Sequence, residues 1–410
     1  MYIGRRDKPS PADIAPWSGT FYAAARLPAA VKEKGEPRTR VLREVEEAWA
    51  EDLHFRGGRI LGSMCTEPAA IAKRAHARFV EVNLGNPGYY PGTARLERQV
   101  VRWLADLLHG DGVDGFMLSG GTEANLTALW VARNTARKKE VLFPASAHFS
   151  VLKAIDLLDL EPVEVELDEA YRMDVTDLRR KLSRNTCAVV AVAGTTELGQ
   201  VDPIDEIGKL TRGRWFLHVD AAFGGFVLPF LGDPRVPPWD FRVPGVTSIG
   251  LDGHKMGLAT IPSSALLLRE PSHLWNIAHE SPYLTRLKHT SLLGTRASAA
   301  VAGTYAVMRA TGRAGYRRIV QRCLRVTRHL LKEARALGFE PAVDPVMNLL
   351  VLKTKRAEAA VAALEARGWR TSISRHPPGL RLVVMPHVSL ARAKEFAADL
   401  RAVSEKLGLP

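Results

Sequence analysis

Short apolar runs alternate with amphipathic helical segments through the middle of this chain of 410 residues. Between residues 115 and 268, each run is followed by a segment with helical spacing of its apolar positions. The runs are GFMLSG, EVLFP, PVEVEL, CAVVAVAGTT, WFLHVDAAF, VTSIGLD and SALLLR. This alternation predicts an α/β fold in which helices cover both faces of a mostly parallel sheet. Functional side chains in such a sheet lie beyond the carboxyl ends of its strands.

Helical spacing also flanks this central region. It appears at Val41–Asp52 and Pro68–Val82, and a strongly amphipathic helix follows a turn-rich loop at residues 85–93. The apolar face of that helix carries Leu96, Val100, Trp103, Leu104, Leu107 and Leu108. A further helical stretch, from about Thr295 to Leu337, leads into alternating short strands and helices, which predict a smaller α/β domain.

These patterns predict three parts of the chain. Residues 1 to about 36 are rich in proline, alanine and basic residues without a clear period, which indicates an irregular arm. We expect an N-terminal arm with helices at residues 1–61, a large domain at residues 62–297 and a small C-terminal α/β domain at residues 298–410.

Composition and charge narrow the classes of partner. The hydrophobic fraction of 46% and the charged fraction of 25% are typical of a folded globular protein. The net charge of +13 would permit binding to nucleic acid or to an anionic membrane. Because the arginines are scattered and no nucleic-acid-binding motif is evident, the charge fits better with attraction of an acidic metabolite or a cofactor phosphate.

The cysteines and the apolar segments bear on the compartment. Cys65, Cys187 and Cys323 are far apart and odd in number, so they predict neither a disulfide framework nor a metal cluster. A reducing cytoplasm is the expected compartment. The N-terminal residues lack an apolar signal region, and we find no run of roughly 18 apolar residues, so neither export nor a membrane anchor is expected.

A candidate phosphate site lies in LSGGTEANLTALWVAR, residues 118–133. A strand is expected to run into Ser119-Gly120-Gly121-Thr122, and a long amphipathic helix follows. The first N–H groups of a helix are unpaired, and glycines let the backbone approach an anion closely. An ordinary strand-to-helix turn would show the same residues. Because neither a P-loop lysine nor a G-x-G-x-x-G motif is present, one small phosphate is the favoured ligand.

Two further strand ends carry a carboxylate and an amine. Asp220 follows the run FLHV, and Lys255 follows the run TSIGLDGH. Pyridoxal phosphate requires this pair, because the amine forms a Schiff base and the carboxylate keeps the pyridine nitrogen protonated. His148 follows another strand and could stack on the ring.

The sequence gives weaker support to two other chemistries. A metal site could be formed by His148, His218, Asp220 and His254, but the usual ligand spacings are missing and the phosphate site would go unused. Hydrolase chemistry with a serine nucleophile is disfavoured, because the chain has no G-x-S-x-G motif.

With these residues assembled, the chain resembles the group II pyridoxal-phosphate-dependent amino acid decarboxylases, in particular the archaeal-type tyrosine/aspartate branch. The resemblance extends from GSMCTEP at Gly62 to LRLVVMPH, which ends at His387. Its motifs, in order, are GNPGYYPGT, SGGTEAN, AHFS, AGTTELG, HVDAAFGG, GHKMG, PYLT, LGTR and VVMPH. One such motif would be weak, whereas nine in order are highly specific.

The resemblance implies a fold-type I enzyme, similar to aspartate aminotransferase, that forms an obligate homodimer with active sites at the subunit interface. Lys255 would be the Schiff-base lysine, Asp220 the partner of the pyridine nitrogen and His148 the residue stacked on the ring. Further cofactor contacts are implied for Gly121, Thr122 and His254 at the phosphate, Ala222 on the opposite ring face, and Thr195 or Thr196 near the cofactor hydroxyl.

Other implied roles concern the substrate and the neighbouring subunit. Gly294 and Thr295 resemble a loop that reaches the phosphate of the neighbouring subunit. Tyr283 resembles a loop tyrosine that protonates the substrate carbon after carbon dioxide leaves. Arg381 resembles a clamp for the substrate carboxylate.

Two positions depart from the family pattern. Gly253 stands where the branch usually has proline, and Asn86 stands where close relatives carry aspartate, so a substrate contact at Asn86 has changed its charge. We expect L-aspartate as substrate, giving β-alanine, a coenzyme A precursor. L-tyrosine, giving tyramine, is close behind. Arg375 or His376 could pair with the side-chain carboxylate of aspartate.

Two alternatives to decarboxylation remain open. One is carbon–carbon lyase chemistry similar to that of sphingosine-phosphate lyase, although the membrane anchor usual in those proteins is not found in this sequence. The other is a basic binding protein that has kept the fold without catalysis. The joint presence of Lys255, Asp220 and His148 disfavours the second alternative.

Overall fold

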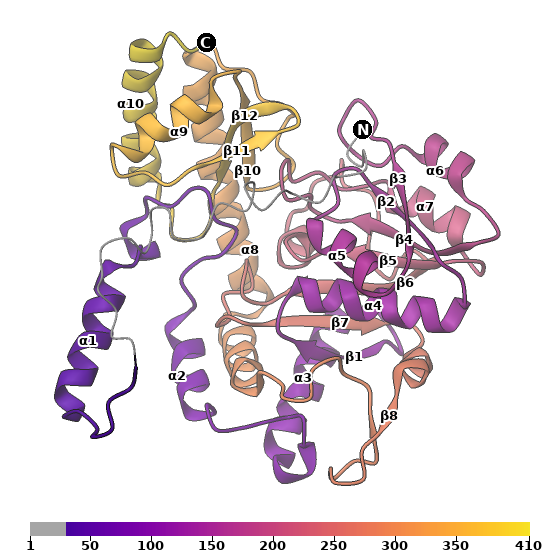
Figure 1. Ribbon diagram of the computed structural model, residues 1–410. Coiled ribbons are helices and arrows are strands. Elements are labelled where there is room, and N and C mark those ends of the chain that lie inside the picture. The colour runs from indigo at the N-terminus through magenta and orange to yellow at the C-terminus, as the bar shows by residue number, and fades with distance from the viewer. Residues whose placement is uncertain (1–29) are drawn as a thin grey trace. The chain divides into compact units, whose positions relative to one another are not determined.

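The computed structural model describes residues 30–410 (Figure 1), so most of the predicted N-terminal arm lies outside the described residues. By its internal contacts the chain divides into two units, Met1–His54 and Phe55–Pro410. The first unit contains helix α1 (Arg38–Glu51), which has no buried residue. This helix confirms the spacing noted at residues 41–52.

A seven-stranded sheet forms the centre of the second unit. Its strands lie side by side in the order β1-β7-β6-β5-β4-β2-β3. β7 is antiparallel to both of its neighbours, β6 and β1, and the other pairs are parallel. The seven apolar runs are thus confirmed as strands of one mostly parallel sheet. The strands are β1 (Asp114–Leu118), β2 (Glu140–Pro144), β3 (Glu161–Val165), β4 (Thr186–Val192), β5 (Phe216–Asp220), β6 (Val246–Asp252) and β7 (Ser264–Leu268).

Alternate side chains of these strands enter two different hydrophobic cores, because successive residues of a strand point to opposite faces. In β4, Val189 and Ala191 belong to one core, whereas Ala188 and Val190 belong to the other. The second core is completed by α4 (Gly121–Ala136) and α5 (Phe149–Leu157). The first core is completed on the sheet by α3 (Pro91–Leu107), α6 (Val175–Lys181) and α7 (Ile204–Thr211).

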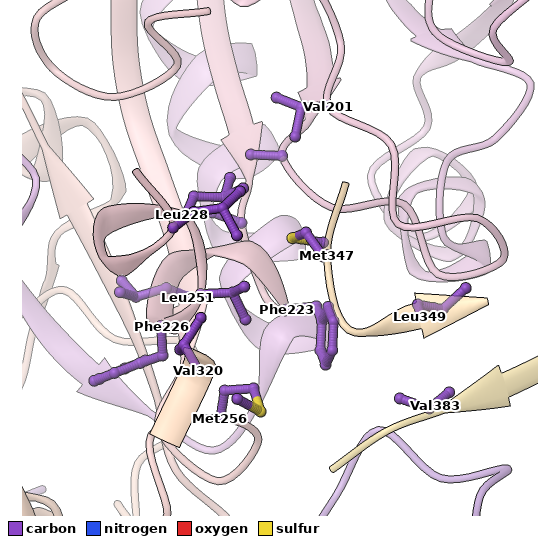
Figure 2. Close-up of a cluster of buried hydrophobic side chains, with 14 of the residues drawn as sticks. Val201, Phe223, Phe226, Leu228, Leu251, Met256, Val320, Met347, Leu349 and Val383 are labelled. Atoms are coloured by element: carbon purple, nitrogen blue, oxygen red, sulfur yellow. The ribbon is translucent and has the colours of Figure 1, made fainter. Parts of the chain in front are cut away.

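The first core continues beyond the sheet into the C-terminal part of the chain. Figure 2 shows Leu251 of β6 and Met256 close to Val320, and it shows Met347 and Leu349 in the same cluster. Val320 belongs to α8 (Ser298–Ala336), a helix of 39 residues with a kink at Gly312. α8 packs against α3 and α2 (Ala70–Arg78) and also against α10 (Leu390–Leu407).

The C-terminal part has its own antiparallel sheet of three strands, in the order β10-β12-β11. Its elements are β10 (Leu349–Lys353), α9 (Ala357–Glu365), β11 (Ser372–Arg375), β12 (Pro378–Val383) and α10. The Ser389 hydroxyl caps α10 by accepting a hydrogen bond from the Arg392 N–H. The predicted small α/β region is confirmed, and the boundaries at residues 61/62 and 297/298 stay predictions.

The remaining elements are short. Residues 79–81 form a turn, so α2 is shorter than the predicted helix at 68–82. A two-stranded hairpin, β8 (His279–Glu280) with β9 (Lys288–His289), carries the loop around Tyr283. Within residues 30–410, no helix combines the length and apolar character needed to cross a membrane. The 3₁₀ helices are η1 (Phe55–Gly57), η2 (Pro87–Tyr89), η3 (Gly224–Phe226), η4 (Leu228–Phe230) and η5 (Pro271–Ile277).

Candidate active site

A cavity of about 320 Å³ lies where several strands of the large sheet end. It is bordered by residues that follow β1, β2, β4, β5 and β6, as expected for a parallel sheet. Eight residues predicted from the sequence line it: Gly121, Thr122, His148, Thr196, Asp220, Ala222, His254 and Lys255. The fold thus brings together most of the predicted cofactor-binding residues.

Lys255 enters the cavity beside a carboxylate that the sequence analysis did not single out. Its Nζ atom lies 3.1 Å from Oδ2 of Asp252, the last residue of β6. Burial lowers the pKa of the Lys255 ammonium, but Asp252 and Asp220 outweigh this effect and raise the pKa above its usual value. In the cofactor-free protein, Lys255 is therefore a positively charged, ion-paired amine.

Asp220, at the end of β5, is held by two donors. Its Oδ1 atom accepts a hydrogen bond from the Ala222 N–H at 3.0 Å, and its Oδ2 atom accepts one from Nδ2 of Asn125 at 2.8 Å. Asn125 lies in the second turn of α4 and lines the same cavity. Both carboxylate oxygens are thus fixed before a ligand binds.

Asn125 is itself oriented by His218 on β5. The Asn125 Oδ1 atom lies 2.9 Å from Nε2 of His218, and because an amide oxygen only accepts, this nitrogen carries the proton. Nδ1 then accepts from the Ser248 hydroxyl at 2.8 Å. Burial lowers the pKa of His218 to about 4, although Asp220 opposes the shift, so the ring is neutral near pH 7.

His148 is linked to the same network through Ser150. The Ser150 hydroxyl accepts from Asn125 at 2.9 Å and lies 2.8 Å from Nδ1 of His148, so it donates to that nitrogen. Burial lowers the pKa of the His148 imidazole, with Asp220 opposing this shift and Lys255 adding to it. A neutral imidazole ring therefore borders the cavity near pH 7.

The N-terminus of α4 forms the predicted phosphate site. α4 begins at Gly121, and the preceding Gly120 supplies no side-chain cap, so the first N–H groups of the helix can serve an anion. A Cβ atom at Gly121 would lie 3.2 Å from the Ala222 methyl group and 3.3 Å from Asp252 Oδ2. Glycine thus permits the close approach of Ala222 and Asp252 to the start of α4.

His254 also lies close to Asp252. Its Nδ1 atom donates to the Ser263 carbonyl oxygen at 2.6 Å, and its Nε2 atom lies 3.7 Å from Asp252 Oδ2. Among residues 30–410, the buried Oδ1 atom of Asp252 has no hydrogen-bond partner. A buried carboxylate oxygen without a partner is unusual.

Five predicted residues lie outside the lining of this cavity. Tyr283 is 83% exposed in the loop between β8 and β9. Thr195 is buried, and its hydroxyl accepts from the Gln200 N–H at 3.0 Å. Asn86, Gly294 and Thr295 lie in two turns that contact each other. Their roles stay predictions.

Arg381 also lies outside the lining, but it contacts a residue that belongs to it. From β12, its Nε atom donates to the carbonyl oxygen of Thr196 at 2.8 Å. Its Nη1 atom donates to Gly62 O and Ser372 Oγ. Nη2 has no partner within residues 30–410. Burial lowers the pKa of Arg381 to about 10, with Glu197 opposing the shift, so the side chain keeps its charge near pH 7.

The structure places two further polar residues in the site. Asp252 stands three positions before Lys255, within the LDGHKMG segment, so the position of an acid at a strand end was visible in the sequence. Asn125 lies four positions after Gly121, and its contact with Asp220 depends on how α4 packs on β5. No local pattern predicts that contact.

A metal site receives no support from this arrangement. In the part of the chain that the structure describes, no group of three or more His, Cys, Asp or Glu side chains is placed to hold a metal ion. His218, one of the four ligands considered, is engaged at both nitrogens by Asn125 and Ser248.

The residues of the cavity fit pyridoxal 5′-phosphate. An amine, a hydrogen-bonded carboxylate, a neutral imidazole and an uncapped helix N-terminus surround one space. Its volume falls within the range of about 300–1,000 Å³ that is usual for ligand pockets. The first N–H groups of α4 would bind the phosphate.

Comparisons with known proteins agree with this geometry. Residues 77–355 match the pyridoxal-dependent decarboxylase conserved domain. A probable L-tyrosine/L-aspartate decarboxylase of Methanothrix thermoacetophila is 45% identical over 374 residues, which cover 90% of this chain and 97% of that protein. A probable L-aspartate decarboxylase of Archaeoglobus fulgidus is 43% identical over 366 residues, which cover 88% of this chain and 99% of that protein.

Solved structures share the fold. A sphingosine-1-phosphate lyase of Burkholderia pseudomallei is 28% identical, with a TM-score of 0.86 over 96% of this chain and 95% of that chain. A glutamate decarboxylase of Lactobacillus brevis is 22% identical, with a TM-score of 0.84 over 96% of this chain and 98% of that chain. The predicted fold class, cofactor and enzyme class are thereby confirmed. The chain belongs to the pyridoxal-dependent decarboxylases, in the branch of the archaeal L-tyrosine/L-aspartate enzymes, and it is a pyridoxal-phosphate-dependent amino acid decarboxylase.

Proposed function

We propose that this enzyme removes the α-carboxylate of L-aspartate to give β-alanine, a coenzyme A precursor, with L-tyrosine as the second candidate substrate. The names of the relatives carry this preference. L-Aspartate is named for both the Methanothrix and the Archaeoglobus protein, whereas L-tyrosine is named for the first alone of these two. Arg375 and His376 do not line the cavity of this chain, so they give the preference no further support.

Each residue of the site would have its own role in binding the cofactor. When bound, pyridoxal phosphate supplies an aldehyde that condenses with amines and a ring that accepts the electrons left behind by departing carbon dioxide. Lys255 would hold it covalently, and Asp220 would keep a proton on its ring nitrogen. Thr122, His254 and the N-terminus of α4 would bind its phosphate. His148 and Ala222 would border the two faces of its ring.

Arg381 is proposed to bind the carboxylate of the substrate. Arg381 is 6% exposed as a residue, and its guanidinium is fixed by its bond to the carbonyl oxygen of Thr196, which lines the cavity. A fixed, charged guanidinium can donate a hydrogen bond to a carboxylate, and orientation of the scissile bond is a large part of such catalysis. Nη2 is the atom left for this task among the described contacts.

The substrate proposal is tested with a panel of amino acids. We expect the cofactor-loaded enzyme to release carbon dioxide from L-aspartate with a kcat/KM at least about tenfold above that for L-tyrosine or L-glutamate. β-Alanine, tyramine and γ-aminobutyrate would be identified by mass spectrometry. Efficient formation of tyramine with aspartate left intact would instead assign the enzyme to L-tyrosine.

Carbon–carbon lyase chemistry is the second candidate, because a sphingosine-1-phosphate lyase shares the fold at 28% identity. The identity of 45% to a protein named as a probable decarboxylase favours decarboxylation. A phosphorylated long-chain amino alcohol added to the same panel would separate the two. Its cleavage to an aldehyde, without carbon dioxide release from any amino acid, would support the lyase.

We further propose a homodimer whose active sites combine residues of both subunits. Tyr283, Gly294 and Thr295 do not line the cavity of their own chain, and Tyr283 is largely exposed. In such a dimer these residues would serve the cavity of the partner subunit, where the Tyr283 hydroxyl would donate a proton to the substrate carbon. The three free cysteines fit a reducing cytoplasm as the working compartment.

Complementation tests the shared site. Lys255→Ala and Tyr283→Phe should each be nearly inactive alone. Mixed under conditions of subunit exchange, they should recover about a quarter of wild-type activity, because half of the dimers would be mixed and each would hold one intact site. Mixtures that stay inactive, although light scattering shows dimers that exchange subunits, would place Tyr283 and Lys255 in the same subunit's site.

A further inference from the structure

The segment from residue 281 to residue 297 contains the Tyr283 loop and the Gly294-Thr295 turn. It lies against a second turn, residues 83–88, which precedes α3. We call residues 83–88 the platform turn. Its contacts with the segment fall into two groups, one near Arg296 and one near Thr285.

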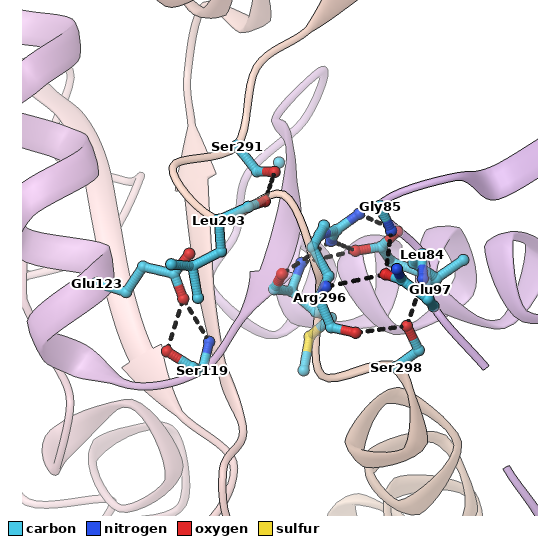
Figure 3. A network of polar contacts seen from close by, with 12 residues as sticks. Leu84, Gly85, Glu97, Ser119, Glu123, Ser291, Leu293, Arg296 and Ser298 are labelled. Atoms are coloured by element: carbon cyan, nitrogen blue, oxygen red, sulfur yellow. Dashed lines mark hydrogen bonds and ion pairs between the residues drawn. The ribbon is translucent and has the colours of Figure 1, made fainter. Parts of the chain in front are cut away.

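The contacts near Arg296 anchor the end of the segment. The Arg296 guanidinium pairs with Glu97 of α3 and donates to the Met117 carbonyl oxygen at 2.8 Å. Figure 3 shows this side chain beside Glu97, and it shows Ser298 bonded to the backbone of Leu84. The Arg296 and Glu97 side chains are 14% and 13% exposed, so this anchor is mostly screened from water.

The platform turn fits closely against this anchor. Oδ1 of Asn83 accepts from the N–H groups of both Gly85 and Arg296, at 2.8 and 3.1 Å. A Cβ atom at Gly85 would lie 1.8 Å from the Gly294 carbonyl oxygen, so only glycine permits this approach. The Gly294-Thr295 turn is therefore held in one place.

The contacts near Thr285 hold the Tyr283 loop. Oδ1 of Asn86 accepts from the Thr285 N–H at 3.0 Å and also from the Thr285 hydroxyl. The Gly88 N–H donates to the same hydroxyl at 2.9 Å. Thr285 stands two residues after Tyr283, and Tyr283 itself is 83% exposed. These three hydrogen bonds are the described polar contacts between the loop and the platform turn.

We propose that Asn86 is a positioning residue that fixes the Tyr283 loop through Thr285. This inference rests on the role proposed above for Tyr283, because a fixed loop matters to catalysis only if the loop carries a functional group. The amide oxygen of Asn86 accepts hydrogen bonds from both the N–H group and the hydroxyl group of Thr285. These two bonds fix the position of Thr285 and thereby the path of the loop that contains Tyr283. The sequence suggested a substrate contact for Asn86, and the geometry points to the loop.

Limited proteolysis measures how strongly the Tyr283 loop is bound to the platform turn, and it does not require enzyme turnover. Trypsin cleaves after Arg286, which directly follows Thr285, and it cuts loops in proportion to the population that is released. The assay uses the full-length, cofactor-loaded enzyme, and mass spectrometry follows the peptide that ends at Arg286. Cleavage at sites elsewhere in the chain serves as the internal reference.

We expect Asn86→Ala and Thr285→Ala each to speed cleavage after Arg286 by about fivefold, the effect of losing about one net hydrogen bond. The double variant should be faster than either single variant, but by less than the product of the two accelerations, because the singles share the loss of the Thr285 hydroxyl bond to Asn86 and each loses one other bond. Asn86→Asp keeps an acceptor at this position and should cleave at the wild-type rate. Thr290→Ala is the matched control, and it should leave cleavage unchanged because the hydroxyl of Thr290 makes no hydrogen bond with the described residues.

Activity gives a separate readout. If Tyr283 acts as proposed, kcat should fall in Asn86→Ala with little change in KM for the substrate. Faster cleavage with unchanged kcat would support the positioning of the loop by Asn86 and would refute the catalytic role of Tyr283. Unchanged cleavage in Asn86→Ala would overturn the inference, and a raised KM in that case would return Asn86 to the substrate. Equal acceleration in Thr290→Ala would also overturn it.

Discussion

Lys255→Ala is expected to abolish covalent attachment of the cofactor and to lower kcat by at least about 10³-fold. Among the residues that line the cavity, Lys255 is the one that carries an amine. Its Nζ atom lies 3.1 Å from Asp252, the last residue of β6, so the amine is held at a strand end that borders the cavity. The measurement is borohydride reduction of the loaded protein followed by peptide mass analysis.

A loss of stability must be separated from a loss of chemistry in this variant. Removal of Lys255 leaves the buried carboxylate of Asp252 without its cation, which destabilises the site. Lys255→Arg keeps a positive charge beside Asp252, but a guanidinium does not condense with an aldehyde under these conditions. We therefore expect Lys255→Arg to fold and to remain unlabelled. Lys153→Ala, which removes an exposed lysine of α5, should keep both label and activity. A label found on another lysine of an active Lys255→Ala enzyme would refute the assignment.

The large sheet could be predicted from the sequence because its five inner strands are almost fully buried. Each of these strands has an apolar run long enough to be recognised without knowledge of its neighbours, whereas the edge strands β1 and β3 are partly exposed. The direction of β7 could not be predicted in this way, since a fully buried strand has the same pattern in either direction. β8 and β9 are two residues long and carry no recognisable pattern of their own.

In the candidate site, some residues could be predicted from local sequence and others could not. Lys255, Asp220 and Gly121 stand at strand ends or at a helix start, so local sequence predicts both their chemistry and their place. Asn125 and His218 act through contacts between α4 and β5, which join residues 93 positions apart. The roles of Asn86 and Thr285 likewise depend on a contact across 199 positions. Such pairs become visible when the chain is folded.

The second large effect is expected for Asp220→Asn, with a fall in kcat of about 10²- to 10³-fold. The substitution removes the negative charge that would hold a proton on the ring nitrogen, while Lys255 remains to bind the cofactor. It also disturbs the local hydrogen bonds. Asp220 accepts from the Ala222 N–H at one oxygen and from Asn125 at the other, so the new NH₂ group must face one of these donors.

Three companion variants separate charge from structure in this experiment. Asp220→Glu keeps the charge but moves the carboxylate by one methylene, so it should recover part of the lost kcat. Asn125→Ala keeps the charge and removes one donor, and it should lower kcat less than Asp220→Asn does. Asp177→Asn changes a buried aspartate of α6, outside the cavity, and should leave kcat unchanged.

Bound cofactor, measured by absorbance after gel filtration, should stay near one per chain in all four proteins, because Lys255 is intact in each. A kcat for Asp220→Asn within about threefold of the wild type, in protein that still binds the cofactor, would show that the charge of Asp220 is not needed, since a preorganised charge contributes far more than that. The electron-accepting role of the ring would then have to depend on the remaining cavity carboxylate, Asp252, which lies beside Lys255 and His254. The same assay on Asp252→Asn would decide between the two carboxylates.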